Sequence, residues 1–308
     1  MRKITPFNVV DGIYFKQECA NETGSIKDRF IMYWLDHMER NGKLKKGDTI
    51  IEASSGNTGI SLSYFGSKRG YNVKIVMPQN MSIERKNLIK NNGSELLECD
   101  AGDFALAASI RDNKILKYGF HSPLQFSNQL NIDAHYWTTG LEIISQFNSI
   151  NPSKSIDVFV SGVGTGGTLI GVAKRLREFF PCVKIVAVEP EESAVMSSRN
   201  AAVHKIQGIG DGFIPQIVKG TGKNGLHELI DEVALVHSEE AIQKAKELAQ
   251  KGHYVGISSG ANFAVSQKYS QEGKNVVTVF ADGASKYISM GLKVNENIEK
   301  PCEDLCRI

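Results

Sequence analysis

The sequence predicts an α/β protein of two doubly wound domains, each a mostly parallel twisted sheet flanked by helices. Short apolar runs alternate with amphipathic helical runs almost throughout the chain, and this alternation places helices on both faces of parallel sheets. Glycine-rich or small polar turns follow several of the apolar runs, at the ends of strands where such sheets bind ligands. The length of 308 residues allows two medium domains with a sizeable core.

Seven apolar runs have the length of short buried strands, and six stretches between them have helical periodicity. The expected strands are 49–53, 72–78, 94–100, 156–161, 183–190, 233–237 and 275–282. The expected helices are 59–68, 83–91, 104–118, 135–147, 168–180 and 239–251. A polar stretch at 127–133 marks the expected domain boundary. The smaller domain would then span 21–132, and the larger would combine 1–20 with 133–308.

The composition is that of an ordinary soluble globular protein, with 41% apolar and 23% charged residues. The net charge of +2 gives no reason to expect nucleic acid or an anionic membrane as a partner. No apolar run approaches the roughly 18 residues that span a bilayer. The first six residues lack the apolar core of a signal peptide, so we expect a cytoplasmic location.

The five cysteines are scattered and odd in number, which argues against a disulfide framework. Cys302 and Cys306 form a C-x3-C pair close to the end of the chain. A zinc site needs four ligands, and neither a second pair nor a nearby histidine accompanies these two. We therefore expect no metal.

Segment 21–29, with the sequence NETGSIKDR, places one lysine between a Gly/Ser turn and the first turn of an expected helix. Apolar residues at 30, 31, 34, 35 and 38 form one face of that helix. Ser25 is expected to be the N-cap, and Asp28 suits the positive end of the helix dipole. Desolvation and a positive local potential would lower the pKa of Lys27. A neutral lysine is a nucleophile that can form a Schiff base, although most lysines are plain surface charges.

The turn after the 49–53 run has the sequence SSGNTG and enters a helix. Its backbone N–H groups and hydroxyls would form an anion cup suited to a carboxylate. An ordinary strand-to-helix turn with an N-cap is the alternative.

The turn after the 156–161 run has the sequence GVGTGGT and also enters a helix. Its glycines let the backbone approach a bound group, and the helix dipole and threonine hydroxyls favour a phosphate. No Gly-Lys-[Ser/Thr] follows, so it is not a P-loop. It lacks the spacing and following acidic residue of a dinucleotide site, although Glu189 comes near to that pattern. A single phosphate fits better, with a plain tight turn as the alternative.

Two further glycine-rich turns lie at 208–213 and 256–260. Each on its own is compatible with a structural role. A Schiff-base lysine, a carboxylate cup, a phosphate cup and a small hydroxyl-bearing turn together imply pyridoxal 5'-phosphate acting on an amino acid.

These motifs also carry a family resemblance. TGSIKDR, SSGNTG, GTGGT, HKIQGIG and GISSG together resemble the cysteine synthase / cystathionine β-synthase family, fold-type-II pyridoxal-phosphate enzymes that replace a group on the β-carbon of an amino acid. The similarity runs from ITPF at 4–7 to FADG at 280–283. Related dehydratases and threonine synthases usually carry different phosphate and asparagine loops, so they rank lower.

The resemblance assigns roles to individual residues. Lys27 would carry the cofactor, Asn57 would bond its ring hydroxyl and Ser258 its pyridine nitrogen. A serine there leaves the nitrogen neutral, which favours loss of a β-leaving group over transamination. The phosphate would be held by Gly164, Thr165, Gly166, Gly167 and Thr168. The substrate carboxylate would be held by Ser54, Ser55, Asn57, Thr58 and Gln125.

The implied activity is cysteine synthesis from O-acetylserine and sulfide through an aminoacrylate intermediate, in a homodimer whose smaller, mobile domain closes over the substrate. One alternative is sulfide release from L-cysteine, with water giving L-serine. Another is cystathionine β-synthase-like use of homocysteine. An alternative of another class is a non-catalytic partner that binds peptide carboxylates, although such a module needs no Schiff-base lysine.

Asp211 departs from the family pattern. Cysteine synthases commonly have a small apolar residue at this position of the GIGxG loop. An acid beside the substrate entrance would repel hydrosulfide, and it would be able to activate water as a catalytic base or to position an amine-bearing nucleophile. The alternative is a solvated loop aspartate that caps a turn.

Overall fold

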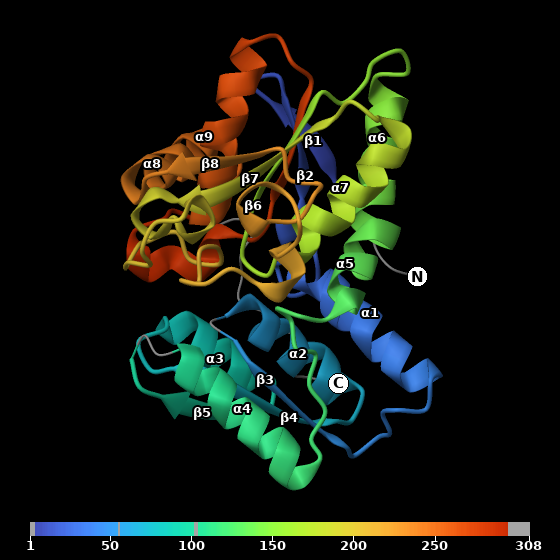
Figure 1. The fold of residues 1–308 in the computed structure, drawn as a ribbon. Coiled ribbons are helices and arrows are strands. Elements are labelled where there is room, and N and C mark those ends of the chain that lie inside the picture. Colours follow the sequence, from blue (N-terminus) through green and yellow to red (C-terminus); the bar gives the residue numbers. More distant parts are fainter. Residues whose placement is uncertain (1–3, 55, 102–103, 295–308) are drawn as a thin grey trace.

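The computed structural model describes residues 4–54, 56–101 and 104–294. Its strands form a six-stranded sheet with the order β1-β2-β9-β6-β7-β8 and a three-stranded sheet with the order β3-β4-β5 (Figure 1). Every pairing is parallel except that of β1 with β2. The predicted α/β class, with mostly parallel sheets between helices, is confirmed.

All seven predicted strands are present, with ends that differ from the prediction by no more than two residues. The larger sheet contains β2 (Ile13–Gln17), β6 (Val158–Gly162), β7 (Lys184–Pro190), β8 (Glu232–Val236) and β9 (Val276–Phe280), with β1 (Phe7–Val10) at its edge. The smaller sheet contains β3 (Thr49–Ala53), β4 (Asn72–Pro78) and β5 (Glu95–Cys99).

The β1–β2 hairpin was not predicted. Asp11 and Gly12 connect the two strands with φ of 50° and 77°, the pair of positive angles that a two-residue type I′ turn requires. An Asp-Gly dipeptide between two apolar runs is a hairpin signal, so the sequence did contain this information.

The helices are α1 (Lys27–Arg40), α2 (Asn57–Lys68), α3 (Ile83–Asn91), α4 (Phe104–Tyr118), α5 (Gln129–His135), α6 (Leu141–Ile150), α7 (Gly167–Phe179), α8 (Ser238–Gln250) and α9 (Ile257–Gln271). The prediction of one helix over 135–147 is wrong. A π-helical turn, Tyr136–Gly140, separates α5 from α6. There the Thr138 hydroxyl donates to the carbonyl oxygen of Ala134 at 2.6 Å, a local bond that competes with the regular helical pattern. None of the described helices combines the length and apolarity that crossing a bilayer would require.

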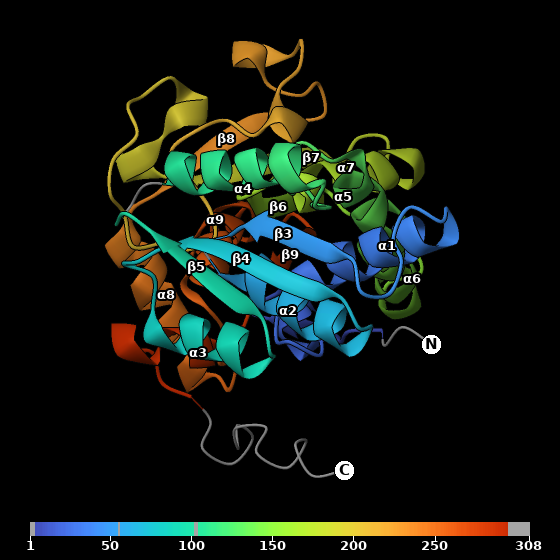
Figure 2. The same cartoon turned by 90° about the horizontal axis from the view of Figure 1, so that it is seen from below.

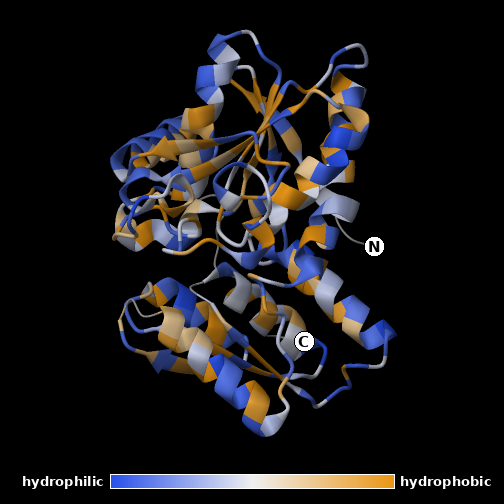
Figure 3. Cartoon of the chain, in the orientation of Figure 1, coloured by the Kyte–Doolittle hydropathy of each residue, from blue (hydrophilic) through white to orange (hydrophobic). Residues whose placement is uncertain are grey.

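Helices cover both faces of the larger sheet (Figure 1). Phe159, Ile185 and Val277 pack with α5, α6 and α7 on one face, whereas the alternate residues Val158 and Val186 pack with α8 and α9 on the other. Strands that are buried on both faces read as continuous apolar runs. Figure 3 shows the same concentration of apolar residues on the strands of both sheets.

The smaller sheet is also covered on both faces (Figure 2). Ile50 and Ile75 pack with α1, α2 and α3, and Ile51 and Val76 pack with α4. The first residue of α1 lies at the junction of the two sheets, where the site residues gather. The domain boundary at 127–133 remains a prediction.

Candidate active site

A pocket between the two sheets brings together the residues that the sequence singled out. It is lined by residues after the carboxyl ends of β3, β6 and β9 and by the first residue of α1, as expected for parallel sheets. The predicted residues among its lining are Lys27, Ser54, Asn57, Thr58, Gln125, Gly164, Thr165, Gly166, Thr168, Asp211 and Ser258. Gly167 is buried but does not line the pocket, and Ser55 lies outside the described residues.

Lys27 begins α1, but Ser25 is not the N-cap that the sequence predicted. Ile26 occupies that position, because residue 25 forms a β-bridge with Asp282 instead. The Ser25 hydroxyl is buried without a hydrogen-bond partner among the described residues. Asp28 does lie in the first turn, where it accepts the N–H of Thr23 at 2.8 Å.

The amino group of Lys27 is held in a dehydrated environment. Burial lowers its pKa, and the negative charges of Asp211 and Asp282 oppose that shift only in part. No hydrogen bond joins this amino group to any residue in the described parts of the chain. A half-buried amine with a lowered pKa, and with no acceptor among the described residues, is suited to act as a nucleophile or base.

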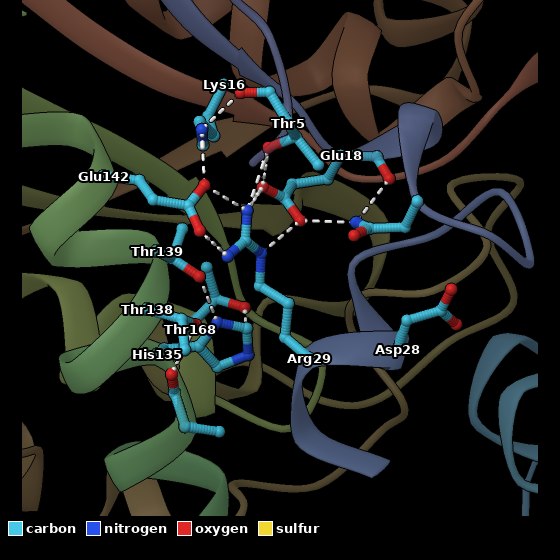
Figure 4. Close-up of polar contacts among 12 residues, drawn as sticks. Thr5, Lys16, Glu18, Asp28, Arg29, His135, Thr138, Thr139, Glu142 and Thr168 are labelled. Carbon is cyan, nitrogen blue, oxygen red and sulfur yellow. Dashed lines mark hydrogen bonds and ion pairs between the residues drawn. The ribbon is translucent and has the colours of Figure 1, made fainter. Parts of the chain in front are cut away.

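A buried ionic cluster anchors α1 two residues beyond Lys27 (Figure 4). Arg29 donates to Glu18 and to Glu142, with N···O distances of 2.7 Å to each, and to the Thr5 hydroxyl at 2.9 Å. Lys16 pairs with Glu142 at 2.6 Å. Burial alone would raise the pKa of Glu18, but the adjacent Arg29 outweighs it and the pKa is lowered. The cluster therefore ties the start of α1 to β2 and α6.

The SSGNTG turn forms a cup of donors at the start of α2. The Ser54 hydroxyl oxygen accepts the N–H groups of Gly56 at 3.2 Å and Gly59 at 3.0 Å, which leaves its own O–H to donate. The Thr58 hydroxyl donates to Oε1 of Gln125 at 2.5 Å, and Nε2 of Gln125 donates to the Ala53 carbonyl at 3.0 Å. The first N–H groups of a helix have no intrahelical acceptor, so the turn is suited to a carboxylate.

The GTGGT turn forms a second cup at the start of α7. Gly166 adopts the left-handed conformation, with φ of 87°. A Cβ on Gly164 would lie 2.3 Å from the carbonyl oxygen of Gly208, and one on Gly167 would lie 2.2 Å from Oδ1 of Asn131. Only glycine fits at these contacts, so the loop can close tightly around one phosphate-sized anion at the positive end of the helix.

Two side chains behind this loop hold its hydroxyls. Nδ2 of Asn131 donates to Oγ1 of Thr165 at 3.0 Å, and Nε2 of His135 lies 3.2 Å from Oγ1 of Thr168 (Figure 4). The nearby acid Glu189, which resembled a ribose-binding residue, instead accepts backbone N–H groups of the following turn at 2.9 Å. This use of Glu189 agrees with a single phosphate rather than a dinucleotide.

Asn57 and Ser258 face the pocket between the two cups. Ser258 lies in the first turn of α9 and is 5% exposed. Nδ2 of Asn57 donates to Asp282 at 2.7 Å, and its Oδ1 accepts from Lys286 at 2.8 Å. A primary amide offers two N–H donors and two acceptor positions, so one donor and one acceptor of Asn57 remain for a bound group.

Asp211 lines both this pocket and an adjoining depression that contains His204 and Val203. Burial raises the pKa of its carboxyl group, and the charges of Lys27, His204 and Arg85 offset only part of that effect. Nε2 of His204 lies 2.8 Å from the Gly210 carbonyl and holds the loop. The carboxyl group thus lies among the site residues rather than in a solvated turn.

The sequence interpretation missed several residues of this region. Arg85 and Asn262 line the pocket, and Asn262 joins the Gly162 N–H to the Val279 carbonyl through bonds of 2.7 and 2.8 Å. Asp282 and Lys286 hold Asn57. Of these residues, Asp282 could have been predicted from the sequence, because it follows the carboxyl end of a strand. Arg85 and Lys286 have the sequence context of ordinary surface charges.

The residues present fit pyridoxal 5'-phosphate. The glycine-lined cup at α7 matches one phosphate, Ser258 supplies a buried hydroxyl and Lys27 a dehydrated amine. The family model described as "Pyridoxal-phosphate dependent enzyme" matches residues 2–282. The chain belongs to this family of pyridoxal-phosphate-dependent enzymes.

Within this family, the chain is similar to cysteine synthases and to a hydrogen sulfide-producing enzyme. The chain is 41% identical over 298 residues to a cysteine synthase of Staphylococcus aureus, covering 95% of this chain and 92% of the relative. A hydrogen sulfide-producing enzyme from Fusobacterium nucleatum is similar in structure, with a TM-score of 0.83, 39% identity and coverage of 92% and 86%. A cysteine synthase from Entamoeba histolytica gives a TM-score of 0.85, 34% identity and coverage of 97% and 90%.

Proposed function

We propose that this protein catalyses β-substitution on a serine-derived amino acid, with O-acetylserine and sulfide giving L-cysteine and acetate as the leading reaction. The observation that carries the proposal is one pocket that combines half-buried Lys27 with an anion cup on each side, at 54–58 and 164–168. One cup suits a substrate carboxylate and the other suits a cofactor phosphate. The similarity to cysteine synthases supports the same reaction.

The residues of the first cup would bind the substrate. The start of α2, the Ser54 hydroxyl and the Thr58–Gln125 pair would hold its carboxylate, and the family resemblance adds Ser55 to this group. Closure of the smaller domain, residues 21–132, over the carboxylate would exclude water during the reaction.

Lys27 would remove the proton from the α-carbon of the substrate. Pyridoxal 5'-phosphate, when bound, withdraws electrons from the substrate's α-carbon and makes its proton acidic. The Lys27 amine, with its lowered pKa, would take that proton as general base. Gly164, Thr165, Gly166, Gly167 and Thr168 would hold the phosphate, Asn57 the ring hydroxyl and Ser258 the ring nitrogen.

The position of Asp211 in the pocket supports a second candidate function, the release of sulfide from L-cysteine. L-cysteine and water would give L-serine and hydrogen sulfide, with the Asp211 carboxylate taking a proton from the attacking water. A half-buried acid in the pocket disfavours an incoming hydrosulfide anion. An aspartate-to-asparagine variant of a structurally similar hydrogen sulfide-producing enzyme was crystallised with an α-aminoacrylate intermediate.

One pair of assays separates the two reactions. Purified holoenzyme is incubated with O-acetylserine and sulfide, or with L-cysteine alone, and cysteine, serine and sulfide are quantified. Rapid cysteine formation without sulfide release supports synthesis, and serine and sulfide in equal amounts support the second candidate. Adding homocysteine tests cystathionine formation; one structural relative is an O-acetylserine dependent cystathionine β-synthase from Helicobacter pylori.

Asp211→Asn gives the matched test. For the second candidate we expect sulfide release from cysteine to fall about 100-fold or more, while the yellow colour of the holoenzyme is kept. Sulfide release at the wild-type rate would exclude water activation by Asp211.

The alternative of a non-catalytic carboxylate-binding partner is tested by colour. A purified protein that is colourless, and stays so after incubation with pyridoxal 5'-phosphate, would favour it. A homodimer in the cytoplasm belongs to the leading proposal by family resemblance, and light scattering of the purified protein tests the dimer.

A further inference from the structure

A buried lysine lies beside the candidate site, in addition to half-buried Lys27. Lys286 belongs to the short helical segment Ala284–Met290 after β9 and is 3% exposed. Its amino group donates to Oδ1 of Asn57 at 2.8 Å and to the Gly24 carbonyl at 3.1 Å. One side chain therefore joins the loop before α1, the start of α2 and the segment after β9, which come together only in the folded chain.

The other end of the Asn57 amide is held by a carboxylate. Oδ2 of Asp282 accepts from Nδ2 of Asn57 at 2.7 Å and from the Tyr287 hydroxyl at 2.7 Å. Asp282 is itself confined, because its side chain is 1% exposed and accepts the Tyr287 hydroxyl. Turning the amide by 180° would place its N–H groups against the Lys286 amine and its oxygen against the carboxylate. The amide therefore has one favourable orientation.

We propose that Lys286 is a positioning residue, which fixes the Asn57 amide so that its remaining N–H is presented to the ring of the bound cofactor. The proposal rests on the proposed function, because it assumes that Asn57 meets that ring. A donor at this place stabilises negative charge on a ring oxygen, whereas a rotated amide would present its carbonyl oxygen and repel it.

The surroundings of Lys286 allow this role in either protonation state. Burial lowers its pKa to about 8; the negative charges of Asp282 and Asp28 oppose this shift, and Arg85 adds to it. An ammonium group has three N–H donors and a neutral amine has two, so both forms can satisfy Asn57 and the Gly24 carbonyl. The orienting contact therefore persists as Lys286 titrates.

The test compares Lys286→Met, Lys286→Arg and Lys286→Gln with the wild type and with the exposed control Lys293→Met. Each protein is stripped of pyridoxal 5'-phosphate and reconstituted, and the dissociation constant and absorption maximum of the bound cofactor are measured. For Lys286→Met we expect affinity to fall about tenfold and the absorption maximum to move. Lys286→Arg keeps a charged donor and should restore the wild-type spectrum, whereas the shorter, uncharged side chain of Lys286→Gln should give a smaller shift than Lys286→Met.

The outcomes separate this inference from the proposed function. A wild-type protein that takes up no cofactor at Lys27 refutes the proposed function. A wild type that does, with an unchanged spectrum and affinity in Lys286→Met, refutes the role of Lys286 alone. If Lys286→Met does not fold, a shifted absorption maximum in folded Lys286→Gln supports the role, and a wild-type spectrum and affinity in Lys286→Gln refute it.

Discussion

Two lysines, buried Lys16 and half-buried Lys27, lie near the start of α1 and differ in what surrounds their amino groups. Lys16 donates to the Thr5 carbonyl at 2.6 Å and to Gln146 at 2.5 Å, and it pairs with Glu142 at 2.6 Å. Lys27 has no such bond to the described residues. Burial lowers the pKa of both.

The difference separates a structural lysine from a reactive one. An ammonium group has three N–H donors, and Lys16 uses all of them inside the protein. A lysine that is fully satisfied cannot attack a bound molecule without breaking those bonds. Burial alone therefore does not identify a reactive lysine, whereas burial without acceptors beside an anion cup does.

The largest expected effect comes from Lys27→Ala. Because Lys27 would carry the cofactor and move the proton, kcat should fall at least about 1,000-fold, and the yellow colour should be lost. Thermal unfolding should occur at a similar or higher temperature, since a half-buried amine without an acceptor among the described residues does not stabilise the fold. Enzyme assay, absorption and thermal melting measure these effects.

Lys16→Met is the matched control for that variant. It should keep the colour and the protein-bound cofactor, but lose about 1–3 kcal/mol of stability through the acceptors left unpaired. A colourless Lys16→Met together with a coloured Lys27→Ala would reverse the assignment of the two lysines.

Arg29→Met should lower the free energy of unfolding without directly affecting a residue that takes part in the reaction. It removes the guanidinium group from buried Glu18, and breaking a buried ion pair costs about 3–5 kcal/mol. Urea unfolding of the apoprotein measures the change. The double replacement of Arg29 and Glu18 by Met should cost less than Arg29→Met, because no buried charge is then left unpaired; an equal or larger cost would contradict this account.

The smallest effect concerns acid stability. The partners Arg29 and Lys16 outweigh burial and lower the pKa of Glu142, so its ion pairs stabilise the fold fully above the pKa of an unfolded glutamate, about 4.3. This contribution disappears as the pH falls through the lower pKa of the folded state. The gap in unfolding free energy between wild type and Glu142→Gln, about 1–2 kcal/mol at pH 7, should narrow below pH 4. A gap that stays constant down to pH 3 would refute the assignment.

The sequence predicted the parallel strands well because both of their faces are buried, which produces continuous apolar runs. Edge strand β1 gave a weaker pattern, with Val9 48% exposed, and the hairpin was missed. The prediction of one helix over 135–147 failed because apolar periodicity does not reveal a π-helical turn.

The candidate site could be predicted wherever a local motif carries it. Lys27 and the two cups each lie within one short segment, so their sequence alone indicated their chemistry. The contact between Lys286 and Asn57 joins residues 229 positions apart, and no spacing rule predicts such a pair. Contacts of this kind depend on how the two sheets meet, which only the structure supplies.

The close approach of Gly164 to the Gly208 carbonyl has a consequence for protein engineering. The loop of Gly164 and the loop that carries Asp211 meet backbone to backbone, with no side chain between them to absorb a change in either. Transplanting one loop into another scaffold without the other would leave a gap that no single substitution fills. The two segments should therefore be exchanged between related scaffolds as a unit.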